Sequence, residues 1–321
     1  VYVAVREVTA WNVAGGTGSF TLTGNDATLT VVAVKAIAAE LGTFTLTGNV
    51  ANFAQQYKIT IDAGDFALTG NDATLEQDPA ITAETGAFSF TGNAATLAKA
   101  AAPKIITADT GTFALTGNPA ALTSISVVEI DPVVASFALN GQPAQLSRSR
   151  IFAADTGTFA LNGEPAALRH SYALAAESGA FAVTGNDAAL RRNPLLSADT
   201  GTYALTGGSP AIAQKYVLSG ATGTFAVSGQ PATFARTRAI GVATGTFTFT
   251  GNPATLTEVN AYEIAATTGT FVLSGSTAQL SRSRIFAADT GTFSATGHPA
   301  TLRQNPRIEA VAGSFTLVGN P

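Results

Sequence analysis

The sequence predicts an all-β fold in which repeats of about 22 residues line up as an elongated tandem-repeat rod. Three observations predict it: an aromatic and two glycines recur at fixed spacing, side chains alternate with the period of a strand, and no helical periodicity persists. The chain has 321 residues, of which 46% are hydrophobic and 12% charged, and its formal net charge is −4. This composition excludes disorder by charge and a strongly basic nucleic-acid binder. Cys and Met are absent, and no apolar run is long enough for a membrane helix, which excludes a thiol enzyme, a disulfide scaffold and a membrane span.

The repeat is anchored on one glycine that recurs fourteen times, at intervals of 22, 24 or 25 residues. An aromatic stands four positions before every anchor, and a second glycine stands two positions before the aromatic in all copies except the one with Ala135. The fourteen copies therefore form a single continuous array over residues 1–321. The anchors are Gly24, Gly48, Gly70, Gly92, Gly117, Gly141, Gly163, Gly185, Gly207, Gly229, Gly251, Gly275, Gly297 and Gly319.

Each unit is predicted to contain two strands and two tight turns. In TGTFALTG (110–117), Phe113 and Leu115 fall on one face and Ala114 on the other, so the aromatic and the leucine are expected to face the core. The anchor then opens a turn of the N-P-A or N-D-A kind, in which glycine can take a positive φ. A second strand of the pattern ATLxRxRxIxA follows. An acid-Thr-Gly triplet such as Asp109-Thr110-Gly111 ends the unit as a turn with a left-handed glycine.

Two architectures satisfy this pattern. In a β-solenoid each unit is one coil, the aromatics stack coil over coil, and the Arg-rich stretch is a corner. In an array of antiparallel β-hairpins, the acid-Thr-Gly turn joins the long strand of one unit to the short strand of the next. The turn chemistry favours hairpins, whereas fourteen units without interruption favour the solenoid.

The ends of the chain suggest an assembly contact. The sequence stops at Gly319-Asn320-Pro321, in the turn after the last anchor, and the alternating Val1, Val3 and Val5 could supply the strand that would follow. We therefore expect head-to-tail self-association through Val1, Val3, Val5, Phe315, Leu317 and Gly319. The alternative is that the chain is a segment of a longer array.

No residue pattern predicts a catalytic, cofactor-binding or metal site. The two histidines, His170 and His298, occupy different repeat positions and are interpreted as surface residues. Acids stand two residues before the first glycine of eight units, where they either cap turns or bind Ca²⁺ weakly; the absence of a G-G-x-G-x-D pattern favours capping. These acids are Glu40, Asp62, Glu84, Asp109, Asp155, Glu177, Asp199 and Asp289.

Two further features concern the surface. Arginines cluster after the leucine of the second strand, where they form a solvated corner, pair with the acids or bind a glycan or nucleic acid; no aromatics interleave with them, which argues against nucleic acid. They are Arg148, Arg150, Arg191, Arg192, Arg236, Arg238, Arg282 and Arg284. The outward strand face carries Thr and Ser around a middle position that is Ala in most units. Threonine rows are typical of ice-binding solenoids, whereas the alanines favour dry packing against a second sheet or protomer.

The repeat pattern G-x-[FY]-x-L-T-G-x-x-A-x-L runs from Gly18-Ser19-Phe20 to Gly313-Ser314-Phe315. It resembles that of repeat-rich, fibre-like structural proteins in phages and prophages of alphaproteobacteria. The resemblance implies a virion-associated fibre or decorating protein and transfers no site residue.

We therefore expect a non-enzymatic structural protein that forms or decorates an extracellular or virion-associated fibre. Its expected partners are further copies of itself and other virion or cell-surface components, with no nucleic acid and no cofactor. The alternative is a surface adhesin, or an ice- or ligand-binding solenoid that uses the Thr/Ala face. A polysaccharide-processing enzyme would need convergent carboxylates, and no unit concentrates them.

Overall fold

Strands of successive units pair in parallel and in register, so the chain is an all-β parallel β-solenoid with a repeat of about 22 residues. The computed structural model describes residues 12–15, 19–24, 26–30, 36–39, 41–54, 59–76, 80–98, 105–108, 110–123, 129–132, 136–147, 151–154, 156–169, 173–191, 195–213, 217–235, 239–257, 263–281, 285–303, 307–310 and 312–319. Two compact units make up the chain: unit 1 comprises Val1–Ala153 and Gly157–Glu164, and unit 2 comprises Ala154–Thr156 and Pro165–Pro321.

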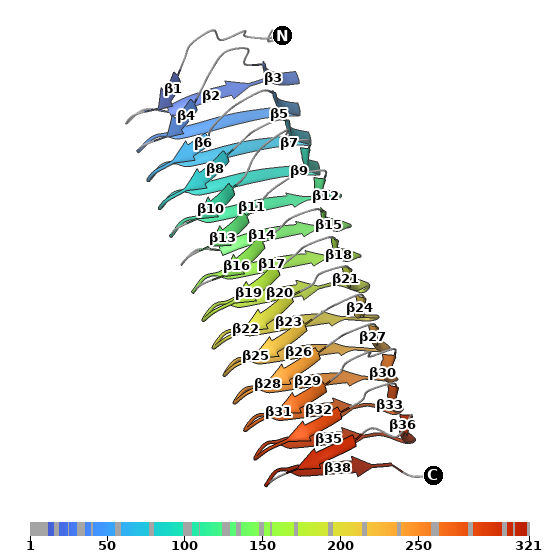
Figure 1. Cartoon of the computed structure of the whole chain (residues 1–321). Coiled ribbons are helices and arrows are strands. Elements are labelled where there is room, and N and C mark those ends of the chain that lie inside the picture. Colours follow the sequence, from blue (N-terminus) through green and yellow to red (C-terminus); the bar gives the residue numbers. More distant parts are fainter. Residues whose placement is uncertain are drawn as a thin grey trace. The chain divides into compact units, whose positions relative to one another are not determined.

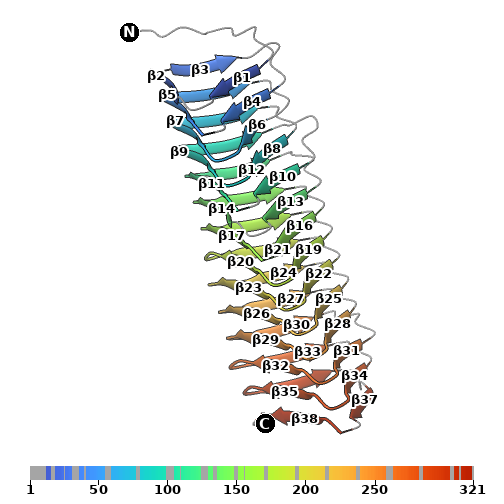
Figure 2. The same cartoon turned by 90° about the vertical axis from the view of Figure 1, so that its left-hand side faces the viewer.

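Each coil contributes strands to three parallel sheets, and the strands stack as successive rungs within each unit (Figure 1, Figure 2). The Phe sheet holds the aromatic strand of each repeat. In unit 1 it consists of β2 (Ser19–Thr23), β5 (Thr43–Ala54), β7 (Asp65–Glu76), β9 (Ala87–Ala98), β11 (Thr112–Gly117), β14 (Ser136–Gly141) and β17 (Thr158–Gly163). In unit 2 it consists of β20 (Ala180–Thr184), β23 (Thr202–Gly207), β26 (Thr224–Gly229), β29 (Thr246–Gly251), β32 (Thr270–Ser274), β35 (Thr292–Thr296) and β38 (Ser314–Val318).

The Leu sheet holds the strand after the anchor glycine. In unit 1 it contains β3 (Asp26–Thr30), the second halves of β5, β7 and β9, then β12 (Ala120–Thr123) and β15 (Ala144–Ser147). In unit 2 it contains β18 (Ala166–Arg169), β21 (Ala188–Arg191), β24 (Ala211–Ala213), β27 (Ala232–Ala235), β30 (Ala254–Thr257), β33 (Ala278–Ser281) and β36 (Ala300–Arg303).

The return sheet leads into the acid-Thr-Gly triplet. Its unit 1 strands are β1 (Asn12–Gly15), β4 (Ala36–Ala39), β6 (Ile59–Ile61), β8 (Ala80–Ala83), β10 (Ile105–Ala108), β13 (Glu129–Pro132) and β16 (Ile151–Ala154). Its unit 2 strands are β19 (Ala173–Ala176), β22 (Leu195–Ala198), β25 (Val217–Gly220), β28 (Ala239–Val242), β31 (Glu263–Ala266), β34 (Ile285–Ala288) and β37 (Arg307–Ala310).

The solenoid prediction is confirmed, and two of its details are corrected. The alternative of antiparallel hairpins is wrong, because the strands on either side of the acid-Thr-Gly triplet pair in parallel with strands of neighbouring coils: β10 pairs with β8 and β13, and β11 pairs with β9 and β14. The predicted two strands per unit are three in most units, because the segment ATLxRxRxIxA is divided between two sheets; in the coils of β5, β7 and β9 one long strand serves both the Phe sheet and the Leu sheet. The halves of the segment are β15 and β16, for example, and residues 148–150 between them lie outside the described residues. The turn signals were right about where the chain bends and did not specify which strands the bend joins.

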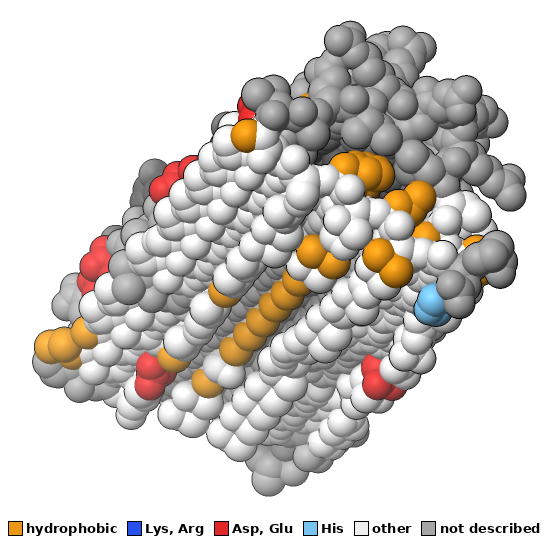
Figure 3. All heavy atoms as spheres, turned by 90° about the horizontal axis from the view of Figure 1, so that it is seen from below, with side chains coloured by type: hydrophobic (Ala, Val, Ile, Leu, Met, Phe, Trp, Pro, Cys, Tyr) orange, Lys and Arg blue, Asp and Glu red, His pale blue; other side chains and the backbone are white. Residues whose placement is uncertain are grey.

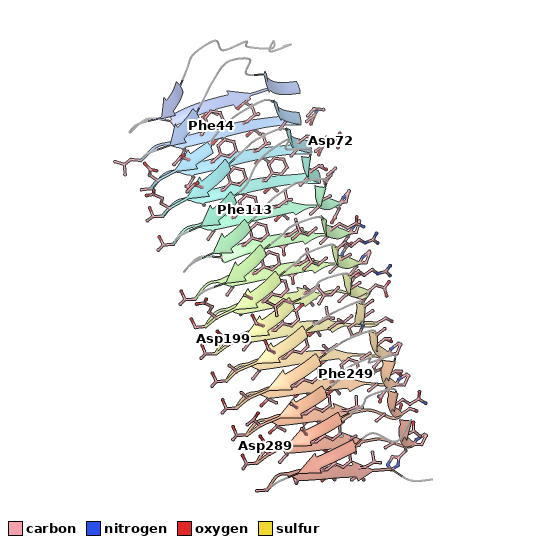
Figure 4. The ribbon with its side chains drawn as sticks, viewed as in Figure 1. Phe44, Asp72, Phe113, Asp199, Phe249 and Asp289 are labelled. Carbon is pink, nitrogen blue, oxygen red and sulfur yellow. The ribbon has the colours of Figure 1, made fainter. Side chains whose placement is uncertain are left out.

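The core of each unit is a column of stacked aromatic rings. In unit 1 the ring centroids of successive members lie 4.8–5.0 Å apart and the rings are inclined by 1–3°. In unit 2 the corresponding values are 4.6–4.9 Å and 1–5°. Figure 4 shows the rings of Phe44 and Phe113, two members of the column in unit 1, between the sheets. Each ring is covered by its neighbours, so burial of the aromatics depends on stacking the coils.

The anchor glycines are required by space rather than by backbone conformation. No described glycine has a positive φ, so the predicted left-handed glycines are wrong. A Cβ on Gly117 would lie 2.7 Å from the backbone nitrogen of Ala95 and 2.8 Å from its Cβ, both in the preceding coil. A Cβ on Gly64, at the first glycine position, would lie against the carbonyl oxygen of Gly42. Glycine therefore recurs because one coil approaches the next too closely for a side chain.

Candidate functional site

The last coil of unit 2 carries the C-terminal half of the predicted assembly residues. Phe315 is half-buried and stacks on Phe293 at 4.7 Å, while Leu317 is 45% exposed. The equivalent Leu273, two coils earlier, is 0% exposed. Gly319 is exposed, and a Cβ on it would lie 2.7 Å from the nitrogen of Ala300. Val1, Val3 and Val5 lie outside the described residues, so the proposed contact between the two ends stays a prediction.

One edge of β38 is bonded and, among the described residues, no strand pairs with the other. On the bonded side the Ser314 amide donates to the carbonyl of Gly291 at 3.0 Å, and the Gly297 amide donates to the carbonyl of Val318 at 2.9 Å. Val318 is 48% exposed. The C-terminal coil therefore presents backbone polar groups beside the apolar side chains of Leu317 and Val318.

The threonine that precedes the first glycine of the repeat connects coils, whether or not an acid stands before it, and sequence reasoning missed this role. The Thr244 amide donates to the carbonyl of Ala221 at 2.7 Å, and the Thr244 hydroxyl donates to the same oxygen at 3.1 Å. The same pair of bonds joins Thr200 to the carbonyl of Glu177. The recurrence of Thr before this glycine was the available signal, but its partner could be identified only once the strands were known to be parallel. We call this arrangement the threonine clasp; it recurs at Thr85, Thr110, Thr222, Thr268 and Thr290.

The acids of the triplet do not act as predicted. Glu84, Glu177, Asp199 and Asp289 are exposed, and among the described residues no carboxylate of these acids or of Asp62 accepts a hydrogen bond. Their backbone carbonyls make the coil-to-coil bonds instead, so the interpretation of these side chains as turn caps is wrong. Figure 4 shows Asp199 and Asp289 pointing away from unit 2. Glu40, Asp109 and Asp155 lie outside the described residues.

Within the described ranges, no group of three or more His, Cys, Asp or Glu side chains could hold a metal ion. His298 is exposed in the turn after its anchor, where its amide donates to the carbonyl of Ser276 at 2.6 Å. His170 lies outside the described residues. In the part of the chain that the structure describes, no helix is long and apolar enough to cross a membrane.

The outer face of the Phe sheet carries alanine between rows of threonine. In unit 2 the half-buried Ala182, Ala204 and Ala226 follow one another in register. Threonines on either side are exposed, as at Thr202 and Thr206. The alanines form the narrow hydrophobic stripe seen from below (Figure 3). The structure thus brings together the Thr/Ala face that the sequence predicted, and its shallow side chains leave the sheet surface flat.

Of the predicted arginine cluster, Arg191 is described. It is exposed at the end of β21, in register with the exposed Arg169 at the end of β18. Arg169 was not among the predicted residues, although it follows the same leucine position. Arg148, Arg150, Arg192, Arg236, Arg238, Arg282 and Arg284 lie outside the described residues.

Tyr203 is the one tyrosine in the aromatic column. Tyr203 is 1% exposed, and among the described residues its hydroxyl has no hydrogen-bond partner. Burial raises the pKa of this phenol well above its usual value. The hydroxyl could form no site reachable from solvent, so it bears on stability rather than on chemistry.

Comparison with known proteins identifies no relative. No protein-family model matches the chain, and neither does any curated protein or solved structure.

Proposed function

We propose that this chain is a non-enzymatic structural protein that forms or decorates an extracellular or virion-associated fibre, and that copies join head to tail by adding coil to coil. The observation that carries the proposal is the parallel, in-register stacking of one coil on the next, as between β35 and β38, where Phe315 stacks on Phe293 at 4.7 Å. A parallel strand edge with apolar neighbours favours pairing with another strand.

The internal construction of the units supports the same proposal. Polar backbone groups and the threonine clasp are used to bond one coil to the next, and the aromatic column is buried only by stacking. A protein whose stability depends on adding coils gains from a further coil contributed by a second copy. Attachment to a virion or cell surface is proposed from the resemblance of the repeat.

Negative-stain electron microscopy of the 321-residue chain over a range of concentrations tests the proposal. We expect filaments whose number rises with concentration. Leu317→Lys should abolish them, because a charge at the strand edge opposes pairing. Thr292→Lys, which places the same charge at an exposed site on the flat face of β35, should leave them intact. Discrete particles at every concentration, or filaments unaffected by Leu317→Lys, would contradict head-to-tail assembly.

A second candidate function is supported by the Thr/Ala face. We propose, as the alternative, a surface adhesin or an ice- or ligand-binding solenoid that uses this face, because its exposed threonines repeat in register on a flat sheet. Thermal hysteresis of the purified chain measures ice binding directly. Hysteresis that Ala226→Tyr removes would favour this candidate, and absence of hysteresis would reject its ice-binding form.

A further inference from the structure

The Thr/Ala face of unit 2 carries no charged residue. It consists of the outward positions of the seven Phe-sheet strands of this unit, and these strands contain no Lys, Arg, Asp or Glu. Strands of the other two sheets do carry charges, for example Arg191 in β21 and Glu263 in β31. The outward side chains of the face are Thr, Ser, Ala and Val, all of them exposed or half-buried. Soluble surfaces usually carry about 25–35% charged residues, and depletion of charge is typical of the centre of a protein interface.

The strands of this face have the arrangement of one half of a steric zipper. They are parallel and in register, so Thr202 lies beside Thr224 and Ala204 beside Ala226. Side chains at one strand position therefore repeat at about 4.8 Å from coil to coil. The seven strands contain no proline, and glycine occurs only at their ends. Uncharged strands of this kind pack face to face as dry, interdigitated pairs of sheets.

The threonine hydroxyls of the face need partners once water is removed from it. Within the described residues, the side-chain hydroxyls of Thr202, Thr206 and Thr248 make no hydrogen bond. A hydroxyl that leaves water without gaining a partner opposes association, and a second hydroxyl can serve it as donor or acceptor. The partner of this face should therefore be uncharged, carry hydroxyls and repeat at the spacing of the coils. The same face of a second copy meets all three requirements.

We propose that two copies of this chain pack side by side, related by a two-fold axis, through the Thr/Ala face of unit 2. Seven strands at about 4.8 Å and about 17 Å of strand length give about 600 Å² on each copy. The total of about 1,200 Å² lies within the range of specific protein interfaces. Each copy has a net charge of −4, so two copies approach most closely where both surfaces lack acids. The contact is lateral, and it is independent of the end-to-end contact proposed above.

Sedimentation velocity of the 321-residue chain carrying Leu317→Lys tests this proposal, because that change is expected to prevent end-to-end joining. We expect a dimer whose fraction rises with protein concentration and is not reduced by salt, since no charges take part in the contact. A monomer at every concentration would overturn the proposal and would leave the face free for the ice or ligand binding considered above. Filaments that persist in this variant would contradict the end-to-end contact instead, and the cross-linking experiment below would still report on the lateral contact.

Two matched substitutions in one coil locate the contact. Thr248 lies on the Thr/Ala face in β29, the middle strand of the seven, and Thr255 lies on the outer face of the Leu sheet in β30; both are half-buried. Thr248→Arg places an unpaired charge in the contact and should weaken dimerisation by about tenfold or more, whereas Thr255→Arg should leave it unchanged. Circular dichroism first establishes that both variants keep the β fold. Equal dimerisation of the two variants would overturn the assignment to this face.

Cysteine cross-linking measures the contact directly, because the chain contains no cysteine of its own. A two-fold axis near the centre of the face brings the two copies of residue 248 close together. Thr248→Cys should therefore give a covalent dimer with a short bis-maleimide reagent, and Thr255→Cys should remain monomeric under the same conditions. Cross-linking of Thr255→Cys in place of Thr248→Cys would move the contact to the Leu sheet and would contradict the proposal.

Discussion

The ring of Tyr203 lies parallel to that of Phe225, with centroids 4.6 Å apart and an inclination of 1°. The stack accommodates the tyrosine in the place of a phenylalanine, while its hydroxyl is buried and has no hydrogen-bond partner in the part of the chain that the structure describes. A buried hydroxyl that has lost its water without gaining a hydrogen bond is a cost to folding.

We predict that Tyr203→Phe stabilises the protein. Removing the unpaired hydroxyl should raise the free energy of unfolding by about 1 kcal/mol, because the phenyl ring keeps the stack. The midpoint of urea unfolding measures the change. Tyr203→Leu is the control and should destabilise the protein, since it removes the stacked ring along with the hydroxyl. A lower midpoint for Tyr203→Phe would show that the hydroxyl has a stabilising partner.

The same tyrosine predicts that the stability of the folded protein depends on pH. Because burial raises the pKa of Tyr203 in the folded protein, its contribution to stability is fully present below the unfolded pKa of about 10 and is lost as pH rises toward the folded value. The advantage of Tyr203→Phe over the natural chain should therefore grow above about pH 10. Thermal unfolding of both proteins between neutral pH and pH 11 measures it, and a constant difference would count against burial as the cause.

We predict that substitution of glycine by alanine changes the free energy of unfolding differently at two positions in unit 2. A Cβ on Gly297 would lie 2.6 Å from the nitrogen of Ala278 and 2.9 Å from its Cβ, whereas a Cβ on Gly241 would meet nothing within 4 Å. Gly297→Ala should cost about 1–3 kcal/mol by overpacking, and Gly241→Ala should be neutral or stabilise by up to about 1 kcal/mol. Urea unfolding compares them. Similar values for both variants would contradict close coil contact as the reason for the anchor glycine.

The threonine clasp predicts that removing the hydroxyl of Thr244 lowers the free energy of unfolding, and that serine at this position restores it. Thr244→Val keeps the shape of the side chain but removes the hydroxyl that donates to Ala221, and should cost about 0.5–1 kcal/mol. Thr244→Ser should retain most of that stability, because serine keeps the donor. Urea midpoints measure both. If valine and serine gave equal midpoints, the hydroxyl bond would contribute nothing.

The sequence was sufficient to predict the period, the buried faces and the flat Thr/Ala surface, because these follow from local alternation around residues such as Phe113 and Leu115. The direction of neighbouring strands could not be predicted from local sequence, because the residues that favour a hairpin turn also favour a corner between sheets. The role of Gly117 was misassigned for a related reason: its constraint comes from Ala95 in another coil, which no local turn preference reports. The clasp at Thr244 was missed because its acceptor lies 23 residues away.

The equivalence of successive contacts bears on how such a gene changes length. Phe88 meets Phe113 at 4.8 Å and Phe137 meets Phe159 at 5.0 Å, both nearly parallel, although the first pair is separated by a longer period. Recombination that excises or inserts a whole period would rejoin surfaces that already fit, so unequal crossing-over yields foldable variants. The number of coils in the protein can thereby change by whole units, and no new coil-to-coil interface has to evolve.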